Sequence, residues 1–167
     1  MTQPFKLRTA TASDLDALNR VIEAAVMTWQ LPERIKRLSL PSYRYTEVDL
    51  AHLQIVVSVD VKGQILGVVS WEPADKRDCP PGKTGLLLYG LYVDPAAQGK
   101  GIGSTLLDAA ITAARNANAD GLLVKAQADA VDFFARRGLQ ALPIEDQTRH
   151  YSNRMWKTMP VEKAANN

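Results

Sequence analysis

The chain has 167 residues, of which 46% are hydrophobic and 23% are charged, and its formal net charge at pH 7 is +2. These values are typical of a globular protein, and we expect one domain over residues 1–160 followed by a flexible tail over 161–167. So small a charge does not favour a nucleic-acid partner. The single cysteine, Cys79, excludes an internal disulfide.

The N-terminal residues contain no apolar signal segment, and no apolar run approaches the about 20 residues that span a membrane. We therefore expect a cytoplasmic protein without a membrane partner. The two histidines, His52 and His150, are far apart in the sequence, so we expect no metal site.

The chain begins with a predicted strand and helix. Residues 5–8 read as a short strand. Apolar residues at helical spacing over 13–27 predict a helix that Ser13 caps, with Asp16 three residues later as the partner of a capping box.

A shorter helix is predicted over 32–40, opening on Pro32, and we expect Pro41 to end it. Two strands over 53–60 and 65–71, separated by a turn, then predict a hairpin. One face of the first of these strands is apolar, with Leu53, Ile55, Val57 and Val59.

The second half continues with a strand over 85–93, whose apolar composition predicts burial on both faces. A strand over 121–126, a helix over 129–137 closed by Gly138, and a strand over 154–159 follow. Between the first two of these strands, a helical stripe comprises Ile102, Leu106, Ala109, Ala110 and Ala113. This mixed order predicts an α/β fold of α+β-like character with helices on both faces of a central sheet.

Three glycines, Gly99, Gly101 and Gly103, lie between a predicted strand and a predicted helix. Glycine allows positive φ and close approach to the backbone, and the first turn of a helix presents unpaired N–H groups and a partial positive charge. Together they predict a loop that binds a phosphate or pyrophosphate, with Ser104 as a further donor and Lys100 as a cationic rim. Alternatively, the glycines only let the helix pack closely on the sheet.

Two other phosphate-binding motifs do not fit. The dinucleotide fingerprint needs a third glycine where this chain has Ser104 or Leu106. The sequence PGKT over 81–84 is similar to the end of a P-loop, but Arg77 stands where that motif needs its first glycine, and a strand follows instead of a helix.

Two motifs resemble those of the GNAT superfamily of acyl-CoA-dependent N-acetyltransferases. Gln98–Gly103 has the pattern Q/R-x-x-G-x-G/A, with V-D-P a few residues upstream, and AQADAVDFFARRGL over 126–139 is similar to the family's N-x-x-A-x-x-F-Y-x-x-x-G-F helix. The two motifs together cover Leu86–Leu139. The resemblance implies a central mixed, mostly antiparallel sheet with a splayed, bulged strand and helices on both faces, and acetyl-CoA as co-substrate.

The resemblance also implies which residues bind the coenzyme. Backbone N–H groups of the glycine loop would bind the pyrophosphate, and backbone groups over 91–93 would bind the pantetheine arm and the acetyl carbonyl, where an N–H stabilises the developing oxyanion. Gln127 matches a family asparagine that contacts the pantetheine or acetyl end. Arg136 and Arg137 either reach the adenosine 3′-phosphate or complement the helix dipole. The expected cofactor-binding residues are Leu91, Tyr92, Val93, Gln98, Gly99, Lys100, Gly101, Ile102, Gly103, Ser104, Gln127 and Phe134.

The sequence departs from the family at the catalytic positions. The tyrosine that protonates the departing thiolate is replaced by Phe134, so Tyr151 or a water is the substitute donor. Glu72 is the carboxylate candidate for deprotonating the amine, or else an exposed loop residue. Tyr89 either holds a water that relays the proton or forms a wall of the pocket.

Three functions remain open at this point. The first is an N-acetyltransferase that moves an acetyl group from acetyl-CoA to an amine of a small molecule or peptide, by direct attack in a ternary complex. The others are a non-catalytic acyl-CoA-binding or sensor module of the same fold and an enzyme that uses a longer acyl-CoA. Relatives are often dimers, which implies a homodimer as one expected state. Several aromatic residues either line the acceptor pocket or fill the core and dimer contacts: Trp29, Tyr43, Tyr45, Tyr151 and Trp156.

Overall fold

The structure is a computed structural model that describes residues 4–160, so the expected tail over 161–167 lies outside the described residues. The chain divides into two compact units. The first comprises Met1–Glu72 and Tyr89–Ala110, and the second comprises Pro73–Leu88 and Ile111–Asn167. The expectation of a single domain over residues 1–160 stays a prediction.

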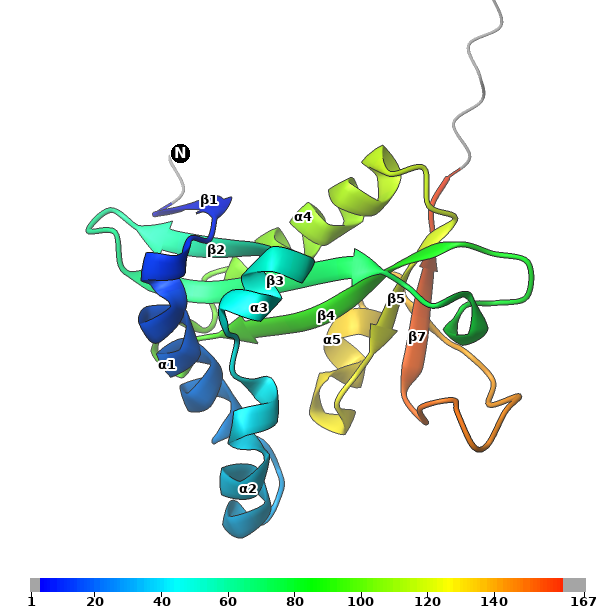
Figure 1. The fold of residues 1–167 in the computed structure, drawn as a ribbon, viewed down its shortest axis with the longest axis horizontal. Coiled ribbons are helices and arrows are strands. Elements are labelled where there is room, and N and C mark those ends of the chain that lie inside the picture. Colours follow the sequence, from blue (N-terminus) through cyan, green and yellow to red (C-terminus); the bar gives the residue numbers. More distant parts are fainter. Residues whose placement is uncertain (1–3, 161–167) are drawn as a thin grey trace, which may run out of the picture. The chain divides into compact units, whose positions relative to one another are not determined.

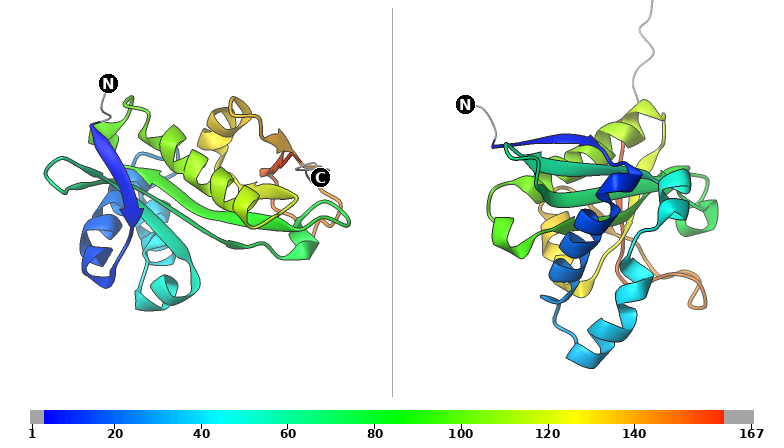
Figure 2. Two further views of the ribbon diagram at one scale, coloured as in Figure 1. Left: turned by 90° about the horizontal axis from the view of Figure 1, so that it is seen from above. Right: turned by 60° about the vertical axis from the view of Figure 1, so that its left-hand side comes forward.

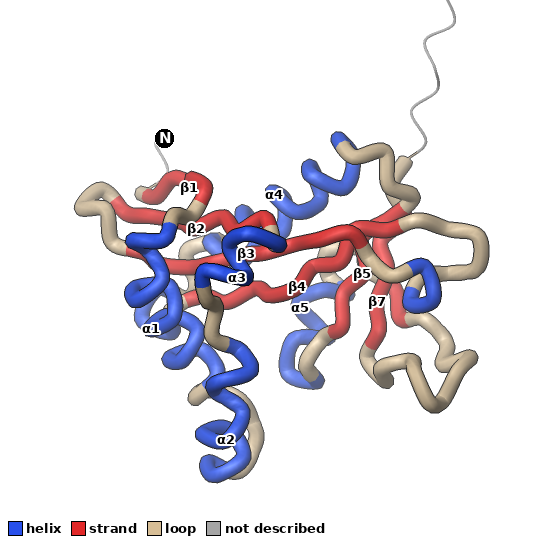
Figure 3. Tube along the Cα trace, in the orientation of Figure 1, coloured by secondary structure: helices blue, strands red, loops and turns tan. Residues whose placement is uncertain are grey.

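Within the described residues, the strands of the seven-stranded sheet lie side by side in the order β1-β2-β3-β4-β5-β7-β6. Figure 1 and Figure 3 label these strands except β6. The β4–β5 pair is parallel, whereas β1–β2, β2–β3, β5–β7 and β6–β7 are antiparallel. This is the mixed, mostly antiparallel sheet that was expected. The strands are β1 Phe5–Thr9, β2 Gln54–Asp60, β3 Ile65–Pro73, β4 Gly85–Val93, β5 Gly121–Lys125, β6 Gln140–Ala141 and β7 Arg154–Thr158.

The described helices include the long helix that follows the glycine loop and one over 47–52 that the sequence patterns did not predict. They are α1 Leu15–Val26, α2 Glu33–Tyr43, α3 Glu47–His52, α4 Ile102–Asn116 and α5 Val131–Ala135. None of the helices within residues 4–160 is long and apolar enough to cross a membrane.

In the first unit, helices cover both faces of the strands. Val57 of β2 and Val68 of β3 are fully buried in one cluster with Ile22 of α1. Gly67, the neighbour of Val68 along β3, faces the opposite side, where a Cβ on it would lie 2.8 Å from Leu106 of α4. The two helices accordingly lie on opposite sides of these strands (Figure 2), as the sequence predicts.

The predicted cap of the first helix is wrong. Thr11 and Asp14 form the capping box, and the helical turn Ala12–Asp14 precedes α1. The Asp14 carboxylate accepts a 2.8 Å hydrogen bond from the backbone N–H of Thr11 and two further bonds, of 2.8 and 2.9 Å, from the Arg8 guanidinium. Asp14 is therefore held by both Thr11 and Arg8. The helical segment begins at this capping box and not at one formed by Ser13 and Asp16.

Pro41 lies inside α2 and does not end it. A proline removes one backbone N–H from the helix, but α2 is already anchored at Leu40, which is 6% exposed in the core of the first unit. The backbone N–H of Arg44 then donates to the carbonyl of Leu40 over 3.2 Å. The packing of Leu40 in the core thus stabilises the helix past Pro41 as far as Tyr43.

The expectation that the strand over 85–93 is buried on both faces is also wrong. Burial alternates along β4: Leu86, Leu88 and Tyr92 are buried, whereas Tyr89 is 46% exposed. The apolar composition of this strand therefore does not mean that both faces are covered by protein.

The second unit is packed around a tryptophan. Trp156 of β7 is 7% exposed and clusters with Cys79 and Leu123. A Cβ on Gly121 would lie 2.3 Å from the Trp156 ring, and one on Gly85 would lie 2.8 Å from it. Trp156 therefore fills the core of this unit and does not line a pocket.

Candidate functional site

The glycine loop predicted to bind phosphate lies in the first unit, between β4 and α4. After β4, the Asp94 carboxylate accepts a 2.9 Å hydrogen bond from the backbone N–H of Ala96 and caps the helical turn Pro95–Ala97. The N–H of Asp94 donates to the carbonyl of Leu66 in β3 over 2.8 Å. The start of the loop is thus tied to the sheet before the glycines begin.

Gly99 and Gly101 adopt φ angles of +82° and +80°, which favour glycine, and no atom lies within 4 Å of a Cβ built on either residue. Close packing on the sheet therefore does not account for these two glycines. The loop from Gln98 to Gly101 is exposed. This segment therefore contains glycine because its backbone adopts positive φ angles and because the space in front of it is open.

The first turn of α4 follows directly. The backbone N–H of Thr105 donates to the carbonyl of Gly101 over 3.1 Å, and its hydroxyl donates to the same oxygen over 3.0 Å. The N–H groups of Ile102 and Gly103 lie in this first turn, at the positive end of a 15-residue helix. Such a terminus attracts and orients an anion.

The second half of β4 leads into this loop. Leu91 and Val93 are half-buried, and Tyr92 is 8% exposed, with its ring stacked on Trp29 at 6.4 Å between centroids. Burial raises the pKa of Tyr92, so this phenol remains neutral. The Tyr92 side chain therefore belongs to the core of the first unit.

Tyr89 and Glu72, two of the predicted catalytic residues, lie near each other in the first unit. Glu72 belongs to β3 and is half-buried, so it is not an exposed loop residue. Burial, and then the charges of Asp49 and Glu72, raise the pKa of Tyr89. The Tyr89 phenol is therefore protonated at neutral pH and can donate a hydrogen bond.

Three aromatic residues in and around α2 belong largely to the core of the first unit. Tyr45 is 3% exposed, and Trp29 and Tyr43 pack against the same cluster with their rings edge to face at 5.2 Å. Tyr45 also lies 6.0 Å from Tyr89 between ring centroids. Tyr45 thus supports β4 from inside the protein and does not line an open pocket.

The remaining predicted residues belong to the second unit. Gln127 is half-buried and stands before the helical turn Ala128–Ala130. Phe134 of α5 is 5% exposed and meets Phe133 edge to face at 5.2 Å. Arg137 lies 3.8 Å above the Phe133 ring centroid, a contact that the helix-dipole interpretation did not include.

Tyr151 is 40% exposed in the loop before β7. Its neighbour His150 holds that loop: His150 Nδ1 accepts from the backbone N–H groups of Glu145 and Asp146 over 3.2 and 3.1 Å, and Nε2 donates to the carbonyl of Arg77 over 3.0 Å.

Sequence reasoning missed a charged cluster in the second unit. The buried Asp78 carboxylate lies 3.0 Å from Arg149 and 3.5 Å from Lys125, and Arg154, which is 3% exposed, donates to the carbonyls of Asp78 and Pro143. These residues are widely separated in the sequence, so no local pattern could have found them. Among residues 4–160, no group of His, Cys, Asp or Glu side chains could hold a metal ion.

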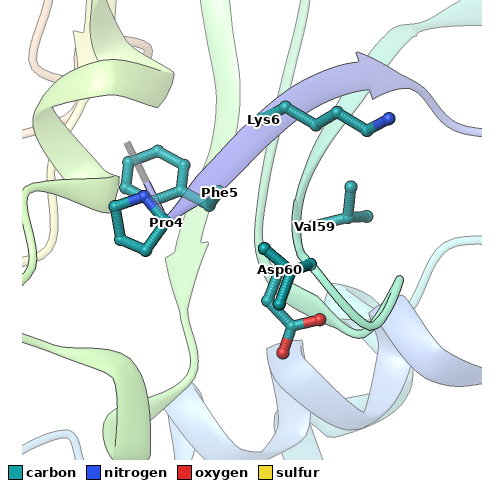
Figure 4. Close-up of a pocket in the computed structure, with 6 residues that line it drawn as sticks. Pro4, Phe5, Lys6, Val59 and Asp60 are labelled. Atoms are coloured by element: carbon teal, nitrogen blue, oxygen red, sulfur yellow. The ribbon is translucent and has the colours of Figure 1, made fainter. Parts of the chain in front are cut away.

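A hollow beside β1, lined by Pro4, Phe5, Lys6, Val59, Asp60 and Val61, contains none of the predicted site residues (Figure 4). It lies where Phe5 pairs with Asp60 across the β1–β2 ladder. The hollow therefore has no part in the candidate site.

The fold is similar to those of several solved acetyltransferases. The PaiA N-acetyltransferase of Thermoplasma acidophilum, in complex with coenzyme A, has a TM-score of 0.71 at 15% identity, covering 93% of this chain and 99% of that one. A GNAT family acetyltransferase of Brucella melitensis in complex with acetyl-CoA has a TM-score of 0.64 at 18% identity, with 99% and 95% covered. A GCN5-related N-acetyltransferase of Rhodopseudomonas palustris has a TM-score of 0.70 at 22% identity, with 95% and 98% covered.

A comparison with curated proteins finds no significant match. The model of the acetyltransferase (GNAT) family, in contrast, matches residues 21–139. Since this match spans more than half of the sequence, the chain belongs to the GNAT acetyltransferase family.

Proposed function

We propose that this protein is an N-acetyltransferase that moves an acetyl group from acetyl-CoA to an amine of a small molecule or peptide. The observation that carries the proposal is the exposed glycine loop at the start of α4 in a chain of the GNAT family. Two solved structures of similar fold contain coenzyme A or acetyl-CoA, which supports the choice of co-substrate.

The residues of the first unit fit the pyrophosphate of this co-substrate. Gly99 and Gly101 leave open space in front of the backbone, and the N–H groups that open α4 are donors beside a partial positive charge. Lys100 is exposed beside them and supplies a cation. We assign the binding of the pyrophosphate to Gln98, Gly99, Lys100, Gly101, Ile102, Gly103 and Ser104, and that of the pantetheine and acetyl group to the backbone of Leu91, Tyr92 and Val93.

When bound, acetyl-CoA supplies an activated acetyl thioester. The protein's own residues orient the acceptor amine and remove its proton, and we assign the proton to the Glu72 carboxylate, directly or through a water held by Tyr89. Because the raised pKa of Tyr89 keeps its phenol protonated, Tyr89 orients the amine or the water and does not act as the base. Holding the reactants in a productive geometry supplies much of the rate.

A covalent acetyl-cysteine does not fit the chain. Cys79 is 5% exposed, and burial raises the pKa of its thiol, whereas a nucleophilic cysteine needs an accessible thiolate. This favours direct attack of the amine over transfer through the enzyme. The assignments to Gln127, Phe134 and Tyr151 in the second unit stay predictions.

Calorimetric titration with acetyl-CoA tests the glycine loop. Gly101→Glu places a side chain and a negative charge in front of the loop, and we expect its affinity for acetyl-CoA to fall at least about a hundredfold because like charges repel at short range. The matched control is Gly63→Glu, since Gly63 has a φ of +81° and equally open surroundings in the β2–β3 turn. Equal affinity of the two variants would refute the placement of the coenzyme.

A second function is favoured by one observation: Phe134, at the position of the family's proton-donating tyrosine, is a buried ring without a donor. That function is a non-catalytic acyl-CoA-binding module. Steady-state release of coenzyme A thiol, measured with a panel of amines, separates the two, because turnover with any acceptor excludes the module. Comparing acetyl-CoA with longer acyl-CoA thioesters in the same assay identifies the acyl group.

A further inference from the structure

Gly90, in the second half of β4, has no room for a side chain. A Cβ on Gly90 would lie 2.5 Å from the Tyr45 hydroxyl oxygen and 2.7 Å from Cε2 of Tyr92. We call this space beside the Gly90 Cα, filled by the Tyr45 hydroxyl and the Tyr92 ring, the Gly90 notch. The notch lies one residue before Leu91, where the backbone assigned to the acetyl group begins.

The Tyr45 side chain reaches the notch from a fixed position. Asn19 of α1 clamps the Tyr45 backbone: its Oδ1 accepts from the Tyr45 N–H and its Nδ2 donates to the Tyr45 carbonyl, each over 2.8 Å. The Tyr45 hydroxyl is hydrogen-bonded to the Ser70 hydroxyl of β3 over 2.5 Å. Tyr45 is 3% exposed and Ser70 is fully buried, so neither hydroxyl can turn to solvent instead.

The other wall of the notch is fixed as well. Tyr92 follows Leu91, and its ring is stacked on Trp29 with an interplanar angle of 20°. The backbone is thus held by Tyr45 at Gly90 and by Trp29 at Tyr92, with Leu91 between the two. Burial raises the pKa of both tyrosines, so no change of charge disturbs these contacts near neutral pH.

From these contacts we infer that Tyr45 is a positioning residue for acetyl transfer: its hydroxyl, held by Ser70, occupies the Gly90 notch and sets the backbone of Leu91 and Tyr92. The inference rests on the proposed function, because it concerns the strand assigned to the acetyl group. A misplacement of about 1 Å at a reacting group can lower a rate about a hundredfold. Fixed backbone donors also need no reorganisation when charge develops.

A double-mutant cycle tests the inference. In Gly90→Ala, the new methyl group meets the clamped Tyr45 hydroxyl, and β4 must shift. In Tyr45→Phe the hydroxyl is removed and the notch is left partly open. In the double variant the methyl group takes the place of the hydroxyl, so we expect part of the lost function to return, with the contact to Tyr92 limiting the recovery.

Three measurements are made on each variant: kcat and KM in the thiol-release assay, affinity for acetyl-CoA by calorimetry, and hydrogen exchange of the Leu91 and Tyr92 amides. We expect each single variant to lower kcat about tenfold or more and to speed exchange of these amides. The double variant should exceed Gly90→Ala in kcat. Unfolding midpoints in urea show whether loss of the fold explains the change.

Two control variants lie in the same unit. Val59→Ala leaves a buried position of β2 partly empty, and Ser39→Ala removes a hydroxyl that donates to the Ile35 carbonyl in α2. We expect both controls to keep the wild-type kcat and the wild-type exchange of the Leu91 amide. Strictly additive losses in the cycle, or equal losses in the controls, would overturn the inference.

The inference and the proposed function fail in different ways. If the wild-type protein neither binds acetyl-CoA nor releases thiol with any amine, the proposed function is wrong. If the wild-type protein is active and Tyr45→Phe changes neither kcat nor the exchange of the Leu91 amide, only the positioning role of Tyr45 is wrong.

Discussion

The ion pair between Arg8 and Asp14 stabilises the folded protein, and the lowered pKa of Asp14 gives the size of this contribution. Hydrogen bonds from the Arg8 guanidinium, and then from the Thr11 backbone, hold the pKa of Asp14 at about 2, compared with an ordinary value of 3.8. That difference corresponds to about 2 kcal/mol in favour of the folded state. The Arg8 side chain is 39% exposed and Asp14 is 11% exposed, so screening by solvent reduces the expected contribution to about 1–2 kcal/mol.

The substitution Asp14→Asn keeps an acceptor for the Thr11 N–H but removes the charge. Since the pKa of Asp14 is lowered by folding, its contribution is present above about pH 4 and is lost as the pH falls toward 2. Urea unfolding of wild type and variant should therefore differ by about 1–2 kcal/mol at pH 7, and the two curves should converge as the solution is acidified through that range.

The control is Glu33→Gln, which removes an ion pair with Arg37 whose side chains are 67% and 66% exposed. Such a surface pair within a helix contributes about 0.3–0.5 kcal/mol. If Asp14→Asn destabilises the protein no more than Glu33→Gln at pH 7, or if the difference persists at pH 2, the assignment of Asp14 as the anchor of α1 is refuted.

Three further predictions follow from the second unit. Gly121→Ala should destabilise the protein by about 3 kcal/mol or more in urea unfolding, because a Cβ there would lie 2.3 Å from the Trp156 ring and 2.7 Å from a backbone oxygen; Gly82→Ala, with open surroundings, is the control, and an equal effect would contradict the packing. His150→Ala should speed hydrogen exchange of the Glu145 and Asp146 amides, which donate to His150, and unchanged exchange would exclude His150 as the holder of the loop. Tyr151→Phe should lower kcat about tenfold to a hundredfold if Tyr151 protonates the thiolate and should leave acetyl-CoA affinity unchanged; full activity would leave water as the donor.

Local patterns predicted most of the fold of this chain. The alternation in β2 placed Ile55, Val57 and Val59 on one buried face, and the structure confirms it. The alternation did not show that the other face of β2 is covered too, where Ser58 is fully buried. Local patterns failed at Ser13 because another local capping box, Thr11 with Asp14, starts the helical segment earlier. They failed at Pro41 because Leu40 packs in the core, a contact that no local pattern shows.

The candidate site also has one part that the sequence predicts and one part that it does not. The glycine loop was predictable because conformation and charge at a helix start depend on adjacent residues, and the φ angles of Gly99 and Gly101 are of the expected kind. The Gly90 notch was not predictable, since Tyr45, Ser70 and Gly90 come from three separate segments. The amine acceptor, a homodimer, a cytoplasmic location and the absence of a nucleic-acid partner stay predictions.

The presence of Phe134 determines which groups the proposed reaction depends on. Its ring is buried against Phe133 and offers no proton, so the leaving thiolate depends either on another donor or on its own stability. A free thiol has a pKa of about 8.5, and a thiolate is therefore a tolerable leaving group near neutral pH. Most of the chemical demand then falls on the amine, which must lose its proton before it attacks. In the proposed reaction this demand falls on the residues assigned to the amine, Glu72 of β3 and Tyr89 of β4.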